Sequence, residues 1–307
     1  MKSVNIIVPL FNEESGLLDF FNHLLNHLDT TKYNFVITLV DDGSSDNTWQ
    51  QIESVSHTSI KFRKIKLSRN FGHQGAIFAG LSSFNEDAAI ILDGDFQDDP
   101  EYIPQMIDLW LAGNDIVLAN RIKRKENFVR RSLVSIYYRL QNKLSEISIP
   151  KNVGHYSLMD QKVVVELVNL KETKKFLLGL RSYVGFKTTY LNVVRKKREF
   201  GSSKMSFTKL LKLSSEGLIG FSTAPLNLIG LIGIIISIGA IIFSFVALFI
   251  KTFLGKTLLN WNFGLTSIYF LSGIQLLSIS VLGQYISKIF DETKKRPQFI
   301  IEKTLEN

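Results

Sequence analysis

Two carboxylates separated by one glycine form the strongest chemical signal in the sequence. Asp93, Gly94 and Asp95 directly follow the apolar run Ala88–Leu92, and Gln97 comes two positions later. Carboxylate oxygens in a turn suit a hard divalent cation such as Mg²⁺ or Mn²⁺, and glycine allows a ligand to approach the backbone closely. The alternative is an acidic turn without function, since Asp and Gly are ordinary turn residues. The polar clusters elsewhere in the chain decide between these interpretations.

Short apolar runs alternate with longer amphipathic stretches over the first 120 residues. The β-branched composition of the runs predicts strands at Val4–Leu10, Phe35–Val40, Lys61–Leu67, Ala88–Leu92 and Asp115–Ala119. Helical periodicity predicts helices near residues 14–28, 46–56, 74–83 and 101–111. This alternation predicts an α/β domain with a mostly parallel sheet, in which ligands bind at the carboxyl ends of the strands.

Polar clusters stand at those predicted carboxyl ends. Besides the Asp93 segment, the clusters are Asn12–Glu14, Asp41–Gly43 and Arg69–Asn70. A carboxylate after the second strand can accept hydrogen bonds from a base or a ribose. The arginine after the third strand brings a cation to a place where a diphosphate could lie. Four such clusters at one edge of a sheet favour a nucleotide and metal site over a chance acidic turn.

The composition excludes some classes of site. The chain has no cysteine, so neither a disulfide framework nor a thiolate metal site is available. An excess of 36 basic over 28 acidic residues gives a net charge of +8. This excess suits nucleic acid, an anionic membrane surface or a phosphate-bearing substrate. The strands lack the interleaved aromatic and basic residues of nucleic-acid binders, so the last two partners are favoured and no nucleic acid is expected.

Two long segments predict membrane spans. Leu226–Ile250 and Phe263–Ile286 contain no charged residue, and each exceeds the roughly 20 residues that cross a hydrocarbon core of about 30 Å. Lysines before the first span and basic residues after the second predict that both flanks are cytoplasmic. The apolar run near the N-terminus is too short for a signal peptide. We therefore expect a multi-pass inner or plasma membrane protein with its catalytic domain and both termini in the cytoplasm.

The ordered motifs resemble those of family-two glycosyltransferases of the GT-A fold, which is Rossmann-like. The matching segments are Val8–Glu14, Asp41–Asp46, Arg69–Gly72, Asp93–Asp98, Arg198–Lys204, Ser272–Leu277 and Lys295–Pro297. Their spacing resembles that in the polyprenyl-phosphate branch of the family, which contains dolichyl-phosphate mannose synthase. The C-terminal part resembles that of the bacterial members with two membrane spans. The resemblance covers nearly the whole chain. It implies transfer of a sugar, first of all glucose from UDP-glucose, to undecaprenyl or another polyprenyl phosphate with inversion, giving a lipid-linked sugar for cell-envelope glycosylation.

The resemblance also implies roles for individual residues. It assigns the nucleotide to Pro9, Glu13, Asp41, Arg69 and Asp93, and Mg²⁺ or Mn²⁺ to Asp93, Asp95 and Gln97. It assigns the acceptor phosphate to Arg121, Arg131, Ser135, Arg198, Ser203 and Lys204. Independently, the segments 121–131 and 195–204 are strongly basic, which suits phosphate oxygens. A solvated basic face or a contact with anionic headgroups explains these segments equally simply, and both roles can coexist.

The chain departs from the family pattern at one position. Many bacterial members have an acidic residue in a Gly-Asp-Phe-Arg-Leu segment, where this chain has His155 and Ser157 in Gly154–Leu158. We expect Asp93, Asp95, Arg121 and His155 to be the catalytic residues. His155 either takes the role of the acidic residue as a base or shapes a sugar pocket. A phosphate monoester with a second pKa of about 6 is largely dianionic at neutral pH and hardly needs a base.

The expected organisation is a catalytic domain over residues 1–205, an interfacial amphipathic helix over 206–224, two spans over 225–290 and a cytoplasmic tail over 291–307. The helix before the spans is alternatively an ordinary surface helix. A further amphipathic helix is predicted over 129–147. Small residues at Gly230, Gly233, Ser237 and Gly239 offer a surface for a homo-oligomer. The alternative functions are a polysaccharide synthase and a non-catalytic membrane scaffold with a transferase-like domain.

Overall fold

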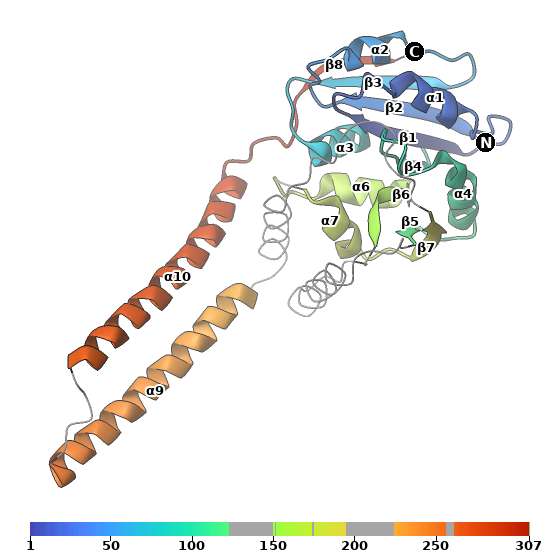
Figure 1. Ribbon diagram of the computed structural model, residues 1–307. Coiled ribbons are helices and arrows are strands. Elements are labelled where there is room, and N and C mark those ends of the chain that lie inside the picture. The colour runs from blue at the N-terminus through green and yellow to red at the C-terminus, as the bar shows by residue number, and fades with distance from the viewer. Residues whose placement is uncertain (123–149, 151, 174, 195–223, 256–260, 307) are drawn as a thin grey trace. The chain divides into compact units, whose positions relative to one another are not determined.

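The computed structural model describes residues 1–122, 150, 152–173, 175–194, 224–255 and 261–306. These residues fall into two compact units (Figure 1). The first contains the described residues up to 194 together with those from Lys295 onward. The second contains two long helices. The amphipathic helices expected over 129–147 and 206–224 lie outside the described residues.

The first unit is built on a mixed, mostly parallel sheet. Its described strands are β1 (Ser3–Leu10), β2 (Asn34–Asp41), β3 (Lys61–Leu67), β4 (Ala88–Ile91), β5 (Ile116–Arg121), β6 (Val153–Asp160), β7 (Thr188–Val193) and β8 (Ile301–Glu306). They lie in the order β7-β5-β6-β4-β1-β2-β3-β8. β1 pairs in parallel with β2 and β4, β2 with β3, and β5 with β7. β6 runs antiparallel to β4 and β5, and β8 runs antiparallel to β3.

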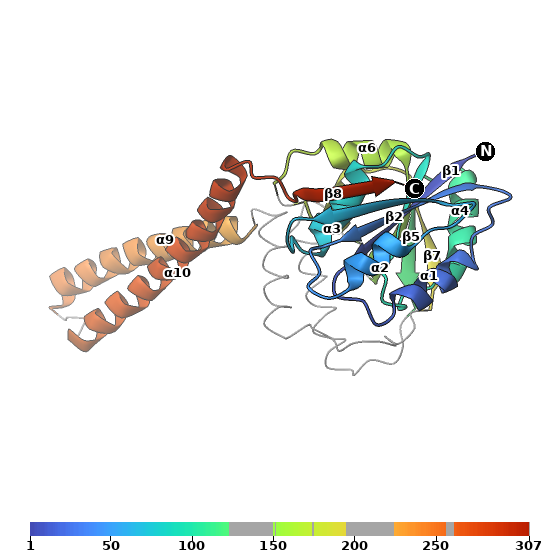
Figure 2. The same ribbon diagram turned by 90° about the horizontal axis from the view of Figure 1, so that it is seen from above.

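Helices cover both faces of this sheet (Figure 2). On one face lie α1 (Leu17–Leu25), α2 (Thr48–Ser54), the 3-10 turn η1 (Pro100–Tyr102) and α4 (Ile103–Leu111). On the other lie α3 (His73–Ser82), α6 (Gln161–Asn169) and α7 (Leu177–Tyr183). Burial on both faces explains why the strands are near-continuous apolar runs, as in α/β proteins generally. The five strands and four helices that the sequence predicts over the first 120 residues are confirmed, and their ends differ from the predicted ones by a few residues.

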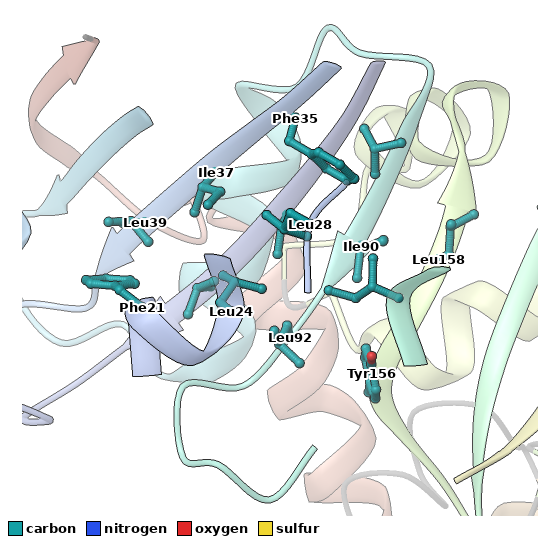
Figure 3. Packing of buried hydrophobic residues seen from close by; sticks show 14 of the residues in the cluster. Phe21, Leu24, Leu28, Phe35, Ile37, Leu39, Ile90, Leu92, Tyr156 and Leu158 are labelled. Atoms are coloured by element: carbon teal, nitrogen blue, oxygen red, sulfur yellow. The ribbon is translucent and has the colours of Figure 1, made fainter. Parts of the chain in front are cut away.

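The core of the first face joins α1 to the central strands (Figure 3). Leu24 of α1 packs against β2 residues such as Ile37, while Leu92 and Tyr156 extend the cluster toward β6. Phe20 of α1 is completely buried, and burial of a side chain of this size stabilises a fold by about 1.5–3 kcal/mol. This packing holds the carboxyl ends of the strands in fixed positions.

The last strand comes from the segment that the sequence analysis treats as a tail. β8 forms an edge of the sheet against β3. Ion pairs link the two strands at Arg63 Nε–Glu306 Oε1 (2.7 Å) and Lys66 Nζ–Glu302 Oε1 (3.2 Å). A third pair joins Lys303 to Glu53, at the end of α2, at 2.7 Å. Most residues of β8 are polar, so its sequence lacks the alternation of apolar and polar residues that predicts a strand.

The second unit contains α9 (Ala224–Leu254) and α10 (Trp261–Thr293). Both include a stretch long and apolar enough to cross a membrane, Leu226–Leu254 and Ser267–Thr293. Large apolar side chains along both helices are exposed, for example Phe245 at 70% and Leu277 at 68%. Exposed apolar surface of this extent is typical of contact with lipid or another protein. The two segments predicted as spans are therefore helical and lack a protein cover within the described residues.

Candidate active site

Strand pairing brings the Asp93 segment opposite His155. In the antiparallel pair of β4 and β6, Ile91 lies opposite Ser157. Two positions beyond the end of β4, Asp93 therefore falls beside His155, which lies two positions earlier on β6. His73 reaches the same place from the first turn of α3, and its ring lies 4.6 Å from the His155 ring between centroids. Three elements that are far apart in the sequence thus contribute one cluster.

His73 and Asp93 form an ion pair within this cluster. His73 Nε2 lies 3.3 Å from Asp93 Oδ1. Burial alone would raise the pKa of Asp93, but the facing His73 and the nearby Arg121 hold it well below its usual range. Burial alone would likewise lower the pKa of His73, yet Asp93, Asp42 and Asp95 raise it above its ordinary value. The carboxylate is therefore ionised, and the imidazole is biased toward its protonated form.

His155 is held in the neutral state by Gln74. The backbone N–H of Leu177 donates to Gln74 Oε1 at 3.0 Å, which identifies that atom as the oxygen because an N–H can only donate. The other amide atom, Nε2, lies 2.8 Å from His155 Nε2 and must be the donor. His155 Nε2 then accepts, and Nδ1 carries the proton. Burial, with further contributions from His73, Arg181 and Arg121, lowers the pKa of His155 to about 3.

Arg121 approaches the cluster from the end of β5. Its Nη2 donates to Asp98 Oδ2 at 2.8 Å, and the Asp98 side chain is fully buried. The guanidinium lies against Gly154 of β6, where a Cβ atom would overlap it. Gly154 is therefore required by the close approach of Arg121. A buried carboxylate fixes this arginine at the same strand ends as Asp93.

Asp41 and Asp42 organise the loops that follow β2 and β3. Asp42 Oδ1 and Oδ2 accept from the backbone N–H groups of Phe71 and Gly72 at 2.7 and 2.9 Å. Asp41 is fully buried and its Oδ1 accepts from Ser44 N at 3.2 Å. Desolvation by burial raises the pKa of both carboxyls. Asp42 thus holds the loop that delivers His73, while Asp41 shapes the turn after β2.

Arg181 of α7 lies behind β6 and is 97% buried, with only 3% of its surface exposed. Its Nη1 donates to Ser157 Oγ at 2.8 Å and its Nη2 to Gly154 O at 3.1 Å. Burial lowers the pKa of Arg181 to about 10, so the guanidinium stays charged at neutral pH. This cation occupies the surroundings of Ser157, and it helps to keep His155 neutral.

The remaining residues expected in the site differ in their surroundings. Pro9 is buried in β1, and the Glu13 backbone N–H donates to Thr48 Oγ1 at 3.0 Å. Arg69 is exposed and stacks on Phe71, with 4.2 Å from the guanidinium carbon to the ring centroid. Asp95 Oδ1 accepts from the backbone N–H of Gln97 at 3.1 Å, and both side chains are partly exposed. Arg131, Ser135, Arg198, Ser203 and Lys204 lie outside the described residues.

Four residues of the cluster were not singled out from the sequence as site residues: His73, Gln74, Asp98 and Arg181. A usable signal was present for three of them. His73 and Gln74 are polar residues at the start of the apolar helix α3, directly after a polar loop. Arg181 stands in the largely apolar segment Leu177–Tyr183, and a cation buried in such a segment needs a hydrogen-bonding partner.

The donor atoms of the cluster fit a divalent cation. Asp93 Oδ1 is buried and lies 3.3 Å from His73 Nε2 in an ion pair, and a metal ion could take the place of that cationic partner. His73, Asp93 and His155 each place one ligand-type atom within 4.8 Å of the others. The carboxylate oxygen of Asp93 suits Mg²⁺ or Mn²⁺. The arrangement can thus hold a cation beside Arg121, which is the chemistry that an anionic leaving group requires.

Residues 5–168 match the sequence model described as Glycosyl transferase family 2. The match covers more than half of the chain, and the chain therefore belongs to glycosyltransferase family 2. The expected GT-A class of α/β fold, with two long apolar helices after the catalytic domain, is confirmed.

Relatives match over nearly their full lengths. An uncharacterized glycosyltransferase of Bacillus subtilis (strain 168), YkcC, is 38% identical over 98% of this chain and 93% of its own length. The prophage bactoprenol glucosyl transferase homolog of Escherichia coli (strain K12) is 36% identical over 98% of both chains. The bactoprenol glucosyl transferase of Shigella phage SfX is 35% identical over 97% of this chain and 98% of its own. The similarity thus includes the two long helices.

Proposed function

We propose that this glycosyltransferase moves glucose from UDP-glucose to a polyprenyl phosphate, such as undecaprenyl phosphate, with inversion at the anomeric carbon. The observation that carries the proposal is the largely buried, ionised Asp93 set beside the Asp98–Arg121 pair at the carboxyl ends of the strands. Relatives named bactoprenol glucosyl transferase, 35–36% identical over nearly the whole chain, support the choice of sugar and acceptor.

In this proposal Asp93 and Asp95 hold Mg²⁺ or Mn²⁺, with Gln97 beside them. When bound, the ion neutralises charge that develops on the departing nucleoside diphosphate. Pro9, Glu13 and Asp41 border the nucleotide, and Arg69 lies at the exposed rim where the diphosphate enters. The loops that the buried Asp42 organises keep these groups in place before substrate binds, which is the preorganisation that electrostatic catalysis depends on.

On the acceptor side, Arg121 binds the phosphate of the lipid together with Arg131, Ser135, Arg198, Ser203 and Lys204. A phosphate oxygen attacks the anomeric carbon as the bond to the nucleoside diphosphate breaks on the opposite side. The acceptor is largely dianionic at neutral pH, so no side chain has to remove a proton. His155 acts as a hydrogen-bond donor through Nδ1–H, because its lone-pair nitrogen is already engaged by Gln74.

The membrane arrangement follows from chain connectivity. α9 and α10 lie between residues that belong to the catalytic unit on both sides, since β8 pairs with β3 after α10 ends. A pair of spans returns the chain to the side from which it left, whereas a single span would separate β8 from its sheet. We infer that α9 and α10 both cross the membrane and that the catalytic unit and both termini are cytoplasmic. Basic residues flanking the helices agree with this orientation.

The test is transfer of label from a panel of radiolabelled nucleotide sugars to undecaprenyl phosphate, using the full chain in detergent with Mg²⁺ or Mn²⁺. UDP-glucose should label the lipid, and EDTA or Asp95→Asn should remove the activity. Asp108→Asn is the matched control, because Asp108 is exposed on α4. Labelling from another sugar alone would replace glucose in the proposal. Nucleotide binding without labelling of the lipid by any donor would refute the lipid acceptor.

A further inference from the structure

A second group of side chains, which the proposed reaction does not use, has the composition of a transition-metal site. His23 and His27 lie one turn apart on α1, and Asp99 lies in the loop after β4. Each offers one ligand-type atom, and these atoms all lie within 4.8 Å of one another. Two imidazoles and one carboxylate are a ligand set that Zn²⁺ takes in proteins.

The hydrogen bonds prepare His27 as a ligand. Its Nδ1 lies 2.9 Å from the backbone oxygen of His23. A carbonyl oxygen can only accept, so Nδ1 carries the proton and Nε2 keeps its lone pair. Metal-binding histidines usually make this same bond, donating one ring N–H to a carbonyl while the other nitrogen binds the ion. The tautomer of His27 therefore matches the one that a metal requires.

His23 and Asp99 form the other half of the site. His23 Nε2 lies 3.1 Å from Asp99 Oδ1, and the His23 and His27 rings are 4.7 Å apart between centroids. A proton now lies between the nitrogen and the carboxylate oxygen. A Zn²⁺ ion that replaced this proton would need ligand atoms about 3.3 Å apart, given bonds of about 2.0–2.1 Å in a tetrahedron. The present separations, 3.1 Å for His23 Nε2 to Asp99 Oδ1 and within 4.8 Å for every pair, lie near that value.

Burial also suits a bound ion. The Asp99 side chain is 2% exposed, which supplies a fixed anionic oxygen away from water, while the His23 side chain is 34% exposed and leaves a path for entry. We propose that His23, His27 and Asp99 form a binding site for Zn²⁺ or a similar transition-metal ion, distinct from the Mg²⁺ or Mn²⁺ site at Asp93. In the proposed function the Mg²⁺ or Mn²⁺ site takes oxygen atoms of Asp93, Asp95 and Gln97, whereas this site offers two imidazoles, which favour zinc.

An ion at this site would tie α1 to the loop that carries the Asp93 segment. Asp99 caps η1 through Oδ1, which accepts from Glu101 N at 3.1 Å, and its backbone oxygen accepts from Tyr156 Oη at 2.9 Å. The preceding residue, Asp98, holds Arg121. The metal would therefore brace the loop between α1 and β6 and limit its motion near the donor site.

Co²⁺, which takes zinc sites and absorbs visible light, is the probe for this proposal. The full chain in detergent, without a polyhistidine tag and with excess Mg²⁺ present, is titrated with Co²⁺. We expect one Co²⁺ per chain with the spectrum of a low-coordinate nitrogen and oxygen site. His27→Gln should weaken binding at least tenfold, while His57→Gln should not, because His57 lies in an exposed loop. Thermal unfolding of metal-free His27→Gln checks that the fold is retained.

The double variant His73→Gln/His155→Gln removes both imidazoles of the other cluster. Co²⁺ binding that survives in this variant and weakens in His27→Gln supports the proposed site. Binding that is unchanged in a folded His27→Gln variant, or that disappears in the double variant instead, overturns it. If His27→Gln does not fold, His23→Gln gives the same comparison from the more exposed side of the site. Neither result depends on transferase activity, so the metal-site proposal can be refuted while the proposed function still holds.

Discussion

Gln74 Nε2 donates a hydrogen bond of 2.8 Å to His155 Nε2. The backbone N–H of Leu177 fixes the orientation of this amide from its other end. A glutamine on α3 thereby fixes the tautomer of a histidine on β6, and burial keeps that histidine neutral. At position 155 the chain therefore presents a neutral hydrogen-bond donor.

Gln74→Glu should reverse this assignment. A carboxylate at position 74 can still accept from Leu177 N, but it can only accept from His155, which then has to carry a proton on Nε2. We expect the pKa of His155 to rise from about 3 toward its ordinary value. Ring-nitrogen NMR shifts of the protein labelled with ¹⁵N-histidine report the tautomer directly, with His155→Gln identifying the signal. Gln105→Glu on the exposed face of α4 is the matched control. An unchanged His155 signal in Gln74→Glu would show that Gln74 does not set the tautomer.

Gly154→Ala should disable Arg121 without removing it. The added Cβ would overlap the guanidinium, so the arginine has to leave Asp98 or the strands have to separate. Overpacking of this kind typically costs about 1–3 kcal/mol of stability. We expect Gly154→Ala to lower transferase activity at least tenfold and to lower the melting temperature. The double variant Gly154→Ala/Arg121→Ala tests the cause, because the alanine should then add little further destabilisation. Full additivity of the two stability changes would contradict the overlap.

Acid should destabilise the protein partly through His155. The pKa of this group is about 3 in the folded protein and about 6.5 in an unfolded chain. Between these values the unfolded chain binds the proton and the folded protein does not, so stability falls as the pH falls below about 6.5. From pH 7 to pH 5 this contribution is at most about 2 kcal/mol. His155→Gln should therefore lose less melting temperature over this range than the wild type, with EDTA in both samples. Equal losses would mean that His155 does not remain neutral.

Removal of β8 should destabilise the catalytic unit. Truncation after Lys294 exposes the backbone edge of β3 and removes the partners of Arg63 and Lys66. We expect a lower melting temperature and a greater tendency to aggregate, since an unpaired strand edge promotes association. Glu306→Ala is the control, because this carboxylate is 66% exposed and an exposed ion pair contributes less than about 1 kcal/mol. A truncated protein with wild-type stability would show that β8 is dispensable to the sheet.

Sequence periodicity predicted β1 to β5 because their apolar runs are buried on both sides. It also placed Asp93 at the end of a strand, whereas Arg121 came from the family resemblance. It could not find the pairing of β6 with β4, which depends on contacts distant in sequence. That register is what brings His155 to Asp93. The roles of Gln74 and Arg181 were beyond reach for the same reason, since each is defined by a partner on another element. The residues assigned to the acceptor in 131–204 remain predictions.

The position of β8 has a consequence for biosynthesis. The strand that completes the sheet leaves the ribosome after both α9 and α10 have been made. Until then β3 has no neighbour on its outer side. In the proposed two-span arrangement, membrane insertion would precede the final step of folding, and a chain that failed to insert α10 would leave its last strand on the wrong side of the bilayer. Completion of the catalytic domain would then act as a check that both helices have been inserted.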